Sequence, residues 1–395
     1  MFVLKGTKNI AKVFADKIED SAQEQILKFL DHPVFKGTKI SIMPDTHAGT
    51  GAVIGFTCQC DGEYVISNVI GVDIGCGCLM YNLGKIDIDF ERLDNYIRKN
   101  IPSGFHINAD CYSTEINKAY WFNAEFMGFE DWTKSVYSIC DKLKLDPQRV
   151  WKSLKSMGSG NHFCELNKDE EGNVWISVHS GSRNFGLQIA NYHQNKAKEL
   201  MKKFFIDEYK DLEFLPKDMG GSEYLEDMFI AQQYADVNRK MILIDIVENF
   251  FEQDCNFFNK EKTIHSVHNY MEDNHDGTYT IRKGAISAKF GERVVIPISM
   301  RDGVIIGKGK SNANWNYSAP HGAGRLMGRN EAKRTLSLEE YKETMKDVWS
   351  SCISEKTLDE APMAYKSMDF ILNQIKETVY VETIAKPIYN FKAQD

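Results

Sequence analysis

Side chains able to bind metal ions recur beside glycine-rich segments. Asp73 and Cys76 flank Ile74-Gly75, and His162, His179 and His268 follow in later turns or at strand ends. One carboxylate, one thiolate and three imidazoles suit Zn, Mn, Fe or Co better than Mg or Ca. We therefore treat these five residues as candidate metal ligands. Their wide separation in sequence leaves a structural role open for each histidine, and the repeated glycine-turn context favours the metal site.

The cysteines allow a second interpretation. Cys58-x-Cys60 and Cys76-x-Cys78 could supply four thiolates to zinc, but the usual spacing in such sites is Cys-x2-Cys. We expect the other thiols to be buried small hydrophobes or bystanders. These are Cys58, Cys60, Cys111, Cys140, Cys255 and Cys352.

His321 stands among small residues. Gly322 and Gly324 leave room for a phosphate or a base near its ring. Arg325 and Arg329, one helical turn apart, could share a face and offer forked donors to phosphate oxygens. A neutral imidazole can act as a nucleophile and form a phosphoramidate with a nucleoside triphosphate. The structural alternative is a helix N-terminus that happens to contain a histidine.

Other nucleotide-binding patterns are missing or weak. Gly307-Lys308-Gly309-Lys310 lacks the P-loop form, and no Gly-x-Gly-x-x-Gly follows a clear strand. Trp315 and Tyr317 could stack on a base, although packing is the commoner use of such aromatics. Asp45 and His47, in an expected turn, are either partners of metal ligands or plain turn residues.

Composition narrows the class of protein. The chain has 395 residues, is 43% hydrophobic and has a net charge of 48 − 56 = −8, which disfavours a non-specific nucleic-acid coat protein. Nine cysteines, an odd number, predict a reducing compartment. We find neither a signal-peptide pattern nor an apolar run of about 18 residues, so we expect a cytoplasmic protein without membrane association.

Hydrophobic periodicity predicts the elements that must position these side chains. The segment from Ile10 to Leu30 has helical spacing, and Lys39–Met43 reads as a strand that enters a turn. Further helices are expected at Phe90–Lys99, Val136–Leu143, Ile189–Phe205, Tyr224–Phe251, Ser337–Ser350 and Met368–Glu377, and strands at Val174–Val178, within Tyr279–Gly309 and at Val379–Phe391. Without strict βαβ alternation, this order predicts an α+β fold in one large domain covering residues 1–395.

Eight segments together closely resemble the RtcB family of RNA-splicing ligases, in the family's order and through nearly the whole chain. The segments are Met43–His47, Gly71–Gly77, Gly158–Phe163, His179–Arg183, His268–Tyr270, Arg282–Ala285, His321–Arg325 and Ala361–Lys366. The resemblance implies a ligase that uses GTP and Mn²⁺ to join an RNA 3′-phosphate or 2′,3′-cyclic phosphate to a 5′-hydroxyl. It also implies RNA ends as partners and an archease-type activator as a candidate partner.

The resemblance also implies roles for individual residues. His321 would be the guanylylated nucleophile, and Cys76 would bridge two Mn²⁺ ions. Asp73 and His162 would complete one metal site, and His179 and His268 the other. Nucleotide contacts would come from Asn161, Glu165, Ser299, Tyr365 and Lys392, together with Gly322 and Gly324 beside the nucleophile. RNA phosphate would bind Arg183 and Arg329.

One loop departs from the family pattern. Pro297-Ile298-Ser299-Met300-Arg301 stands where the family usually has Pro-Gly-Ser-Met-Gly. Ile298 and Arg301 keep the first of two other functions open, and the metal ligands alone, with no covalent role for His321, would suit the second. One is an RNA-end-binding protein without efficient ligation, and the other is a metallophosphatase acting on RNA ends.

Overall fold

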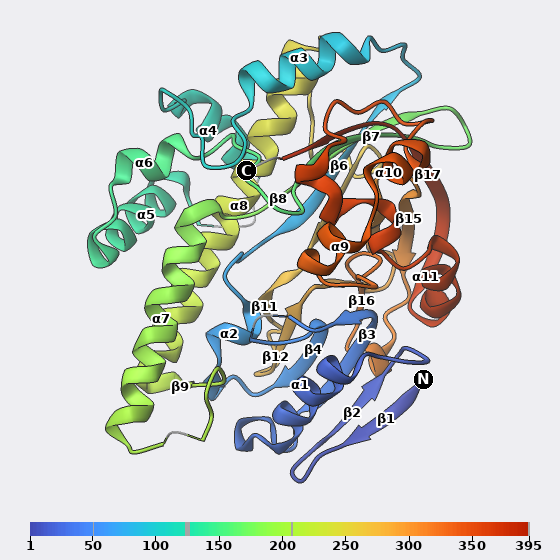
Figure 1. The fold of residues 1–395 in the computed structure, drawn as a ribbon. Coiled ribbons are helices and arrows are strands. Elements are labelled where there is room, and N and C mark those ends of the chain that lie inside the picture. Colours follow the sequence, from blue (N-terminus) through green and yellow to red (C-terminus); the bar gives the residue numbers. More distant parts are fainter. Residues whose placement is uncertain (50, 123–126, 207, 394–395) are drawn as a thin grey trace.

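Two large sheets form the centre of the molecule (Figure 1). The structure is a computed structural model that describes residues 1–49, 51–122, 127–206 and 208–393. The six-stranded sheet has the order β1 (Phe2–Lys5), β2 (Ile10–Val13), β3 (Lys39–His47), β4 (Ile54–Cys60), β12 (Tyr279–Lys283) and β11 (Asn269–Asp273). The seven-stranded sheet has the order β10 (Thr263–Val267), β6 (Gly77–Gly84), β8 (Val174–Ser180), β7 (Phe163–Lys168), β17 (Val379–Lys392), β15 (Gly303–Gly309) and β14 (Arg293–Ser299).

Two small sheets complete the β structure. They pair β13 (Ala285–Ser287) with β16 (Ser318–Pro320), and β5 (Tyr64–Val65) with β9 (Leu215–Pro216). Within the described residues, strand neighbours run antiparallel except for the parallel pair β2–β3. The mixed α/β architecture confirms the predicted fold class.

Helices lie on both sides of the seven-stranded sheet in Figure 1. On one side are α3 (Phe90–Asn100), α4 (Ser113–Trp121), α5 (Phe129–Leu143), α6 (Pro147–Lys152), α7 (Arg183–Lys203) and α8 (Gly221–Asn249). On the other are α9 (Arg329–Thr335), α10 (Leu338–Thr344) and α11 (Met368–Gln374). Helices α1 (Asp20–Asp31) and α2 (Ser67–Ile70) lie near the six-stranded sheet. No helix in the described ranges is long and apolar enough to cross a membrane.

Helix α8 is the central helix of the fold. It is buried on nearly every side, and it packs against α7, β6 and β8. The predicted helix Tyr224–Phe251 is therefore confirmed, with bounds shifted toward the N-terminus by a few residues. A helix surrounded by protein needs no polar stripe, so its polar side chains must find partners inside the molecule.

The prediction of one helix over Ile10 to Leu30 is wrong in its first half. Ile10–Val13 forms strand β2, in which Ala11 and Val13 are buried and Ile10 is exposed. The apolar spacing of a strand and of the following helix α1 merged into one apparent helical period. The predicted turn at Pro44–His47 is also wrong, because β3 continues to His47.

Candidate metal and nucleotide site

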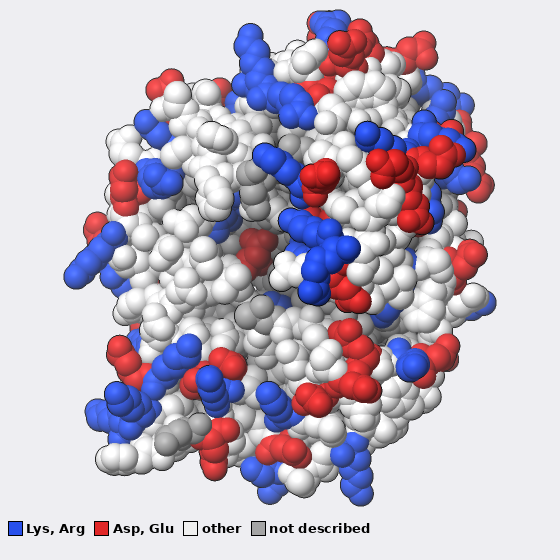
Figure 2. Space-filling model, viewed as in Figure 1, with Lys and Arg blue, Asp and Glu red and all other residues white. Residues whose placement is uncertain are grey.

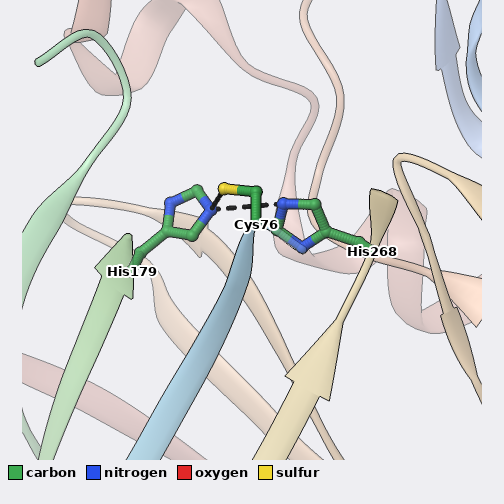
Figure 3. Close-up of side chains that lie close together, drawn as sticks. All are labelled: Cys76, His179 and His268. Carbon is green, nitrogen blue, oxygen red and sulfur yellow. Dashed lines mark hydrogen bonds between the residues drawn. The ribbon is translucent and has the colours of Figure 1, made fainter. Parts of the chain in front are cut away.

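Four of the five candidate metal ligands lie at one edge of four neighbouring strands. In the order β10, β6, β8, β7, they are His268 just after β10, Cys76 just before β6, His179 in β8, and His162 just before β7. The register places Cys78 opposite His179, and His179 opposite Phe163. Figure 3 shows Cys76, His179 and His268 pointing toward one another from their strands. Strand pairing thus gathers side chains that are far apart in sequence.

The ligand atoms form two overlapping groups. The first ligand set consists of Asp73, Cys76 and His162, and the second of Cys76, His179 and His268. Within each set the ligand atoms lie within 4.8 Å of one another. Cys76 Sγ lies 3.4 Å from His162 Nε2 and 3.3 Å from His179 Nε2. The Cys76 thiol is therefore common to both candidate sites.

Backbone carbonyls orient two of the imidazoles. His162 Nδ1 donates to the Met157 carbonyl at 2.9 Å, and His179 Nδ1 donates to the Asn161 carbonyl at 3.3 Å. A carbonyl oxygen only accepts, so Nδ1 holds the proton and Nε2 of each neutral ring is free to bind a cation. His179 Nε2 lies 3.3 Å from His268 Nε2. Converging imidazole nitrogens beside a thiol are the donor arrangement of a borderline divalent metal site.

Burial sets the protonation of these ligands. It lowers the pKa of His179 and His268, and neighbouring imidazoles add to this effect. Burial and the nearby Asp73 carboxylate raise the pKa of the Cys76 thiol. Burial also opposes ionisation of Asp73, yet contacts with His162 and Cys76 lower the pKa of that carboxyl. Metal binding would therefore displace a proton from Cys76.

A cavity of about 650 Å³ lies beside the second ligand set and is lined by His179 and His268. All eight predicted nucleotide-binding residues line this cavity: Asn161, Glu165, Ser299, His321, Gly322, Gly324, Tyr365 and Lys392. Arg329 also lines it. Figure 2 shows a hollow near the centre of the face that is also in view in Figure 1, with acidic atoms in its depth and basic side chains beside it.

His321 is bound by a buried carboxylate that comes from the six-stranded sheet. Its Nδ1 lies 2.7 Å from Asp45 Oδ2, and Asp45 in β3 is fully buried. Its ring centroid is 4.6 Å from that of the metal-ligand candidate His268. With Nδ1 donating to Asp45, Nε2 is the free nitrogen of His321. Asp45 thus binds the candidate nucleophile. It does so from strand β3, so the expectation that it lies in a turn beside the metal-ligand candidates is wrong.

The position of Asp45 is tightly constrained. Lys366 Nζ donates to the Pro44 and Thr46 carbonyls, at 2.9 Å each. Gly324 has φ +73°, and a Cβ there would lie 2.0 Å from the Asp45 carbonyl oxygen. The absent side chain at Gly324 therefore lets the His321 loop approach β3, a role that sequence reasoning did not foresee.

Glu165 lies in the wall of the cavity opposite a strand of the C-terminus. Asn390 Nδ2 donates to Glu165 Oε2 at 2.6 Å, across the β17–β7 pairing. Burial raises the pKa of Glu165 to about 7, against the opposing effect of its hydrogen bonds. This carboxyl can therefore exchange between its neutral and charged forms near neutral pH.

Sequence reasoning missed Glu360, a buried carboxylate at the edge of the cavity. Arg325, Arg329 and Lys392 pair with it, and the Tyr365 hydroxyl donates to it at 2.8 Å. Its position directly before the Ala361–Lys366 segment was the available signal. Arg325 and Arg329 share this carboxylate, but they do not share a helix, because α9 begins at Arg329.

The two predicted RNA-binding arginines differ in their surroundings. Arg329 pairs with Asp359 and Glu360. Arg183, at the start of α7, packs its guanidinium against Gly158 and contacts Ser156 Oγ at 3.3 Å.

The loop that departs from the family pattern borders the cavity. Ile298 is buried and lines it, whereas the Arg301 side chain turns to Asp302 and is 47% exposed. The Ser299 hydroxyl donates to the Asp302 carboxylate at 2.9 Å. The loop thus contributes Ile298 to the cavity wall, and Arg301 points away from it toward Asp302.

Three other interpretations from the sequence do not hold. Among the described residues, Cys58, Cys60 and Cys78 join no cluster able to bind a metal ion, so the four-thiolate zinc site is not formed. Trp315 is buried and stacks on Phe14, with ring centroids 4.0 Å apart, so it packs the core. His321 follows β16, so it does not begin a helix.

Comparison with known proteins gives a consistent result. The family model described as "tRNA-splicing ligase RtcB" matches residues 25–393. The chain is 31% identical to the "RNA-splicing ligase RtcB" of Escherichia coli K12, over 92% of each chain. It is 29% identical to the "tRNA-splicing ligase RtcB" of Aeropyrum pernix, over 83% of this chain and 82% of the relative. The chain is 27% identical to the Thermococcus kodakarensis protein of the same name, over 87% of this chain and 85% of the relative.

Proposed function

The chain belongs to the RtcB family of tRNA-splicing ligases, and we propose that it joins RNA 3′-phosphate or 2′,3′-cyclic phosphate ends to 5′-hydroxyl ends with GTP and Mn²⁺. The observation that supports this most strongly is the placement of His321. Its Nδ1 is bound to buried Asp45, and its ring stands beside His268 in the wall of the large cavity. A free Nε2 at that position suits nucleophilic attack on a nucleotide phosphorus.

The proposed reaction begins with His321. Nε2 attacks the α-phosphorus of GTP, an N–P bond forms, and the bond from that phosphorus to the bridging oxygen breaks to release pyrophosphate. An oxygen of the RNA 3′-phosphate then attacks the same phosphorus, and the N–P bond breaks. The 5′-hydroxyl finally attacks the RNA phosphate and displaces GMP, while its proton passes to solvent. A cyclic phosphate is first hydrolysed to the 3′-phosphate.

The first ligand set would hold one Mn²⁺ and the second ligand set the other, since their donors fit this ion. When bound, the two ions would neutralise phosphate charge and align the reacting groups for in-line displacement. Asp45 keeps Nδ1 of His321 protonated, so the attacking nitrogen is always Nε2. The backbone carbonyls of Met157 and Asn161 hold His162 and His179 in their orientations.

Nucleotide and RNA selection follow from the cavity walls. The Glu165 carboxylate and Lys392 would bind the edge of guanine, and Tyr365 and Ser299 would border it. Asn161 would contact the GTP phosphates. Arg183 and Arg329 would bind RNA phosphate, as arginine forks do.

The proposal includes a single ligase domain over residues 1–395 and a cytoplasmic location. All nine cysteines are free in the structure, which supports a reducing compartment. An archease-type activator remains a predicted partner.

Covalent labelling tests the central step. The full-length protein is incubated with Mn²⁺ and GTP labelled at the α-phosphate, beside an ATP control. We expect an acid-labile adduct that requires GTP and is lost in His321→Ala. His275→Ala, the same change at a histidine that is 89% exposed, is the matched control and should label as the wild type does.

Other outcomes would select the alternative functions. A folded, metal-loaded protein that forms no adduct but binds RNA ends would be an RNA-end-binding protein, with the Ile298–Arg301 loop as the first cause to examine. Release of phosphate from RNA ends without GTP would indicate a metallophosphatase, in which His321 has no covalent role.

A further inference from the structure

Arg239 is a buried cation inside the fold. Its side chain, on helix α8, is fully buried. Asp236, on the same helix, pairs with Lys240 at 2.7 Å and contacts His265 at 3.4 Å, and its charge offsets part of the effect of burial on Arg239. Burying a guanidinium is costly unless its donors are well used. Its hydrogen bonds therefore indicate what it does.

Those hydrogen bonds lead to the second ligand set. Arg239 Nη1 donates to the Gly75 carbonyl and to the Ser180 carbonyl, at 2.7 Å each. Its Nη2 contacts His265 Nε2 at 3.1 Å. Gly75 directly precedes Cys76, and Ser180 directly follows His179. His265 lies on β10, whose end leads into His268.

Arg239 thus links all three segments that bear the second ligand set. The segments also bind one another, because His268 N donates to the Cys76 carbonyl at 2.9 Å and Gly75 N donates to the Asn269 carbonyl at 2.8 Å. One planar guanidinium reaches three acceptors in fixed directions, which a lysine ammonium cannot reproduce.

Asn238, the preceding residue on α8, joins the segment after His179 to the segment that precedes His162. Its amide accepts from Ser156 N at 3.1 Å and donates to the Ser156 carbonyl at 3.1 Å and to Ser180 Oγ at 3.0 Å. Ser180 Oγ in turn donates to the Met157 carbonyl at 2.8 Å. That carbonyl is the one that orients His162, a member of the first ligand set.

We propose that Arg239 and Asn238 are positioning residues of the metal centre. Arg239 acts mainly on the second ligand set, since it contacts all three segments that bear it, and Asn238 joins the segment before His162 of the first set to the segment after His179. Neither touches a ligand atom, and each holds the backbone beside the ligands. The proposal rests on the two-ion centre of the proposed function. Residues that orient metal ligands in this way typically change metal affinity by about 10- to 100-fold.

Mn²⁺ binding to the full-length protein, without GTP or RNA, tests this division of roles. Electron paramagnetic resonance counts the free and bound ions, and spin coupling reports two ions bridged at close range. We expect two coupled ions in the wild type. Arg239→Lys should weaken the binding of one ion by about 10- to 100-fold and abolish the spin coupling, although the positive charge is kept. Asn238→Ser should weaken the binding of the other ion by a similar factor.

Double variants identify which ion is affected. Arg239→Lys combined with His268→Ala should bind Mn²⁺ nearly as His268→Ala does alone, because both changes act mainly on the second ligand set and the first shares only Cys76 with it. Arg239→Lys combined with His162→Ala should lose both ions. The opposite pattern would overturn the assignment.

Arg282→Lys is the matched control, since Arg282 is equally buried but its donors go to the side chains of Ser318, Tyr270 and Glu272. It should keep both ions. Thermal unfolding of the metal-free proteins shows that each variant is folded. If Arg239→Lys bound two coupled ions with wild-type affinity, or if Arg282→Lys lost Mn²⁺ affinity to the same extent, the positioning role would be overturned and the two-ion centre would stand. A wild type that binds fewer than two ions would overturn the two-ion centre and this proposal with it.

Discussion

Replacing Asp45 by asparagine should slow the proposed guanylylation of His321 while leaving the fold intact. When Nε2 bonds to phosphorus and Nδ1 keeps its proton, the ring becomes cationic. Asp45 Oδ2, 2.7 Å from Nδ1, is the carboxylate that stabilises this charge. Two unit charges about 4 Å apart interact by about 4 kcal/mol at an effective dielectric constant of about 20. That energy corresponds to about 10³ in rate.

The asparagine amide oxygen can still accept from Nδ1, so the ring orientation is kept and mainly the charge is lost. We therefore expect a decrease of about 10²- to 10³-fold in the single-turnover rate of adduct formation. Among the described residues, Asp45 Oδ1 has no hydrogen-bond partner, and the new NH₂ group would occupy that buried position. A modest loss of stability should accompany the kinetic effect.

The assay is rapid-quench labelling with α-labelled GTP at saturating Mn²⁺, with thermal unfolding measured in parallel. Asp169→Asn is the matched control, because Asp169 also accepts from a ring N–H, that of Trp175 at 2.9 Å, but does not line the cavity. A folded Asp45→Asn protein that labels within about threefold of the wild-type rate, a difference of under 1 kcal/mol, would refute the reasoning.

Three further predictions follow from the site. Since burial raises the pKa of Glu165 to about 7, GTP affinity measured by calorimetry should fall as the pH drops below 7. In the folded state Glu165 takes up its proton near pH 7, whereas in the unfolded chain it does so only near the ordinary pKa of about 4.5. Protonation of this group therefore makes the protein more stable as the pH falls from 8 toward 5. Glu165→Gln should abolish both effects, and a GTP affinity that is flat from pH 6 to 8 would contradict the proposed role. Gly324→Ala, at φ +73° and with its new Cβ 2.0 Å from the Asp45 carbonyl oxygen, should destabilise the protein by more than about 1 kcal/mol and impair labelling. At Gly328 a new Cβ would meet no described residue within 4 Å beyond its chain neighbours, so Gly328→Ala should change unfolding little. Arg183→Ala should weaken binding of RNA 3′-phosphate ends and reduce its salt dependence while sparing GTP labelling, and loss of labelling instead would place Arg183 at the nucleotide.

The sequence determined the chemical inventory of the site. The types of donor at Asp73, Cys76 and the three histidines predicted a borderline divalent metal, because sulfur, imidazole and carboxylate ligands have intrinsic metal preferences. The long periodic helices, such as α8, were also readable, since a repeat of 3.6 residues is a local property. Where two short elements adjoined, as at β2 and α1, local periodicity was ambiguous and the prediction failed.

Only the tertiary structure decided which of these side chains meet. The pairing order β10, β6, β8, β7 places four candidate ligands at one edge, and no local pattern encodes strand pairings across such long separations. Asp45 reaches His321 from a different sheet, and Glu360 pairs with Arg325, Arg329 and the distant Lys392. Arg239 reads in the sequence as an ordinary helical arginine. The role that we propose for it appears only where packing buries it against the backbone beside the candidate metal ligands, because a buried charge must find its hydrogen-bond partners inside the fold.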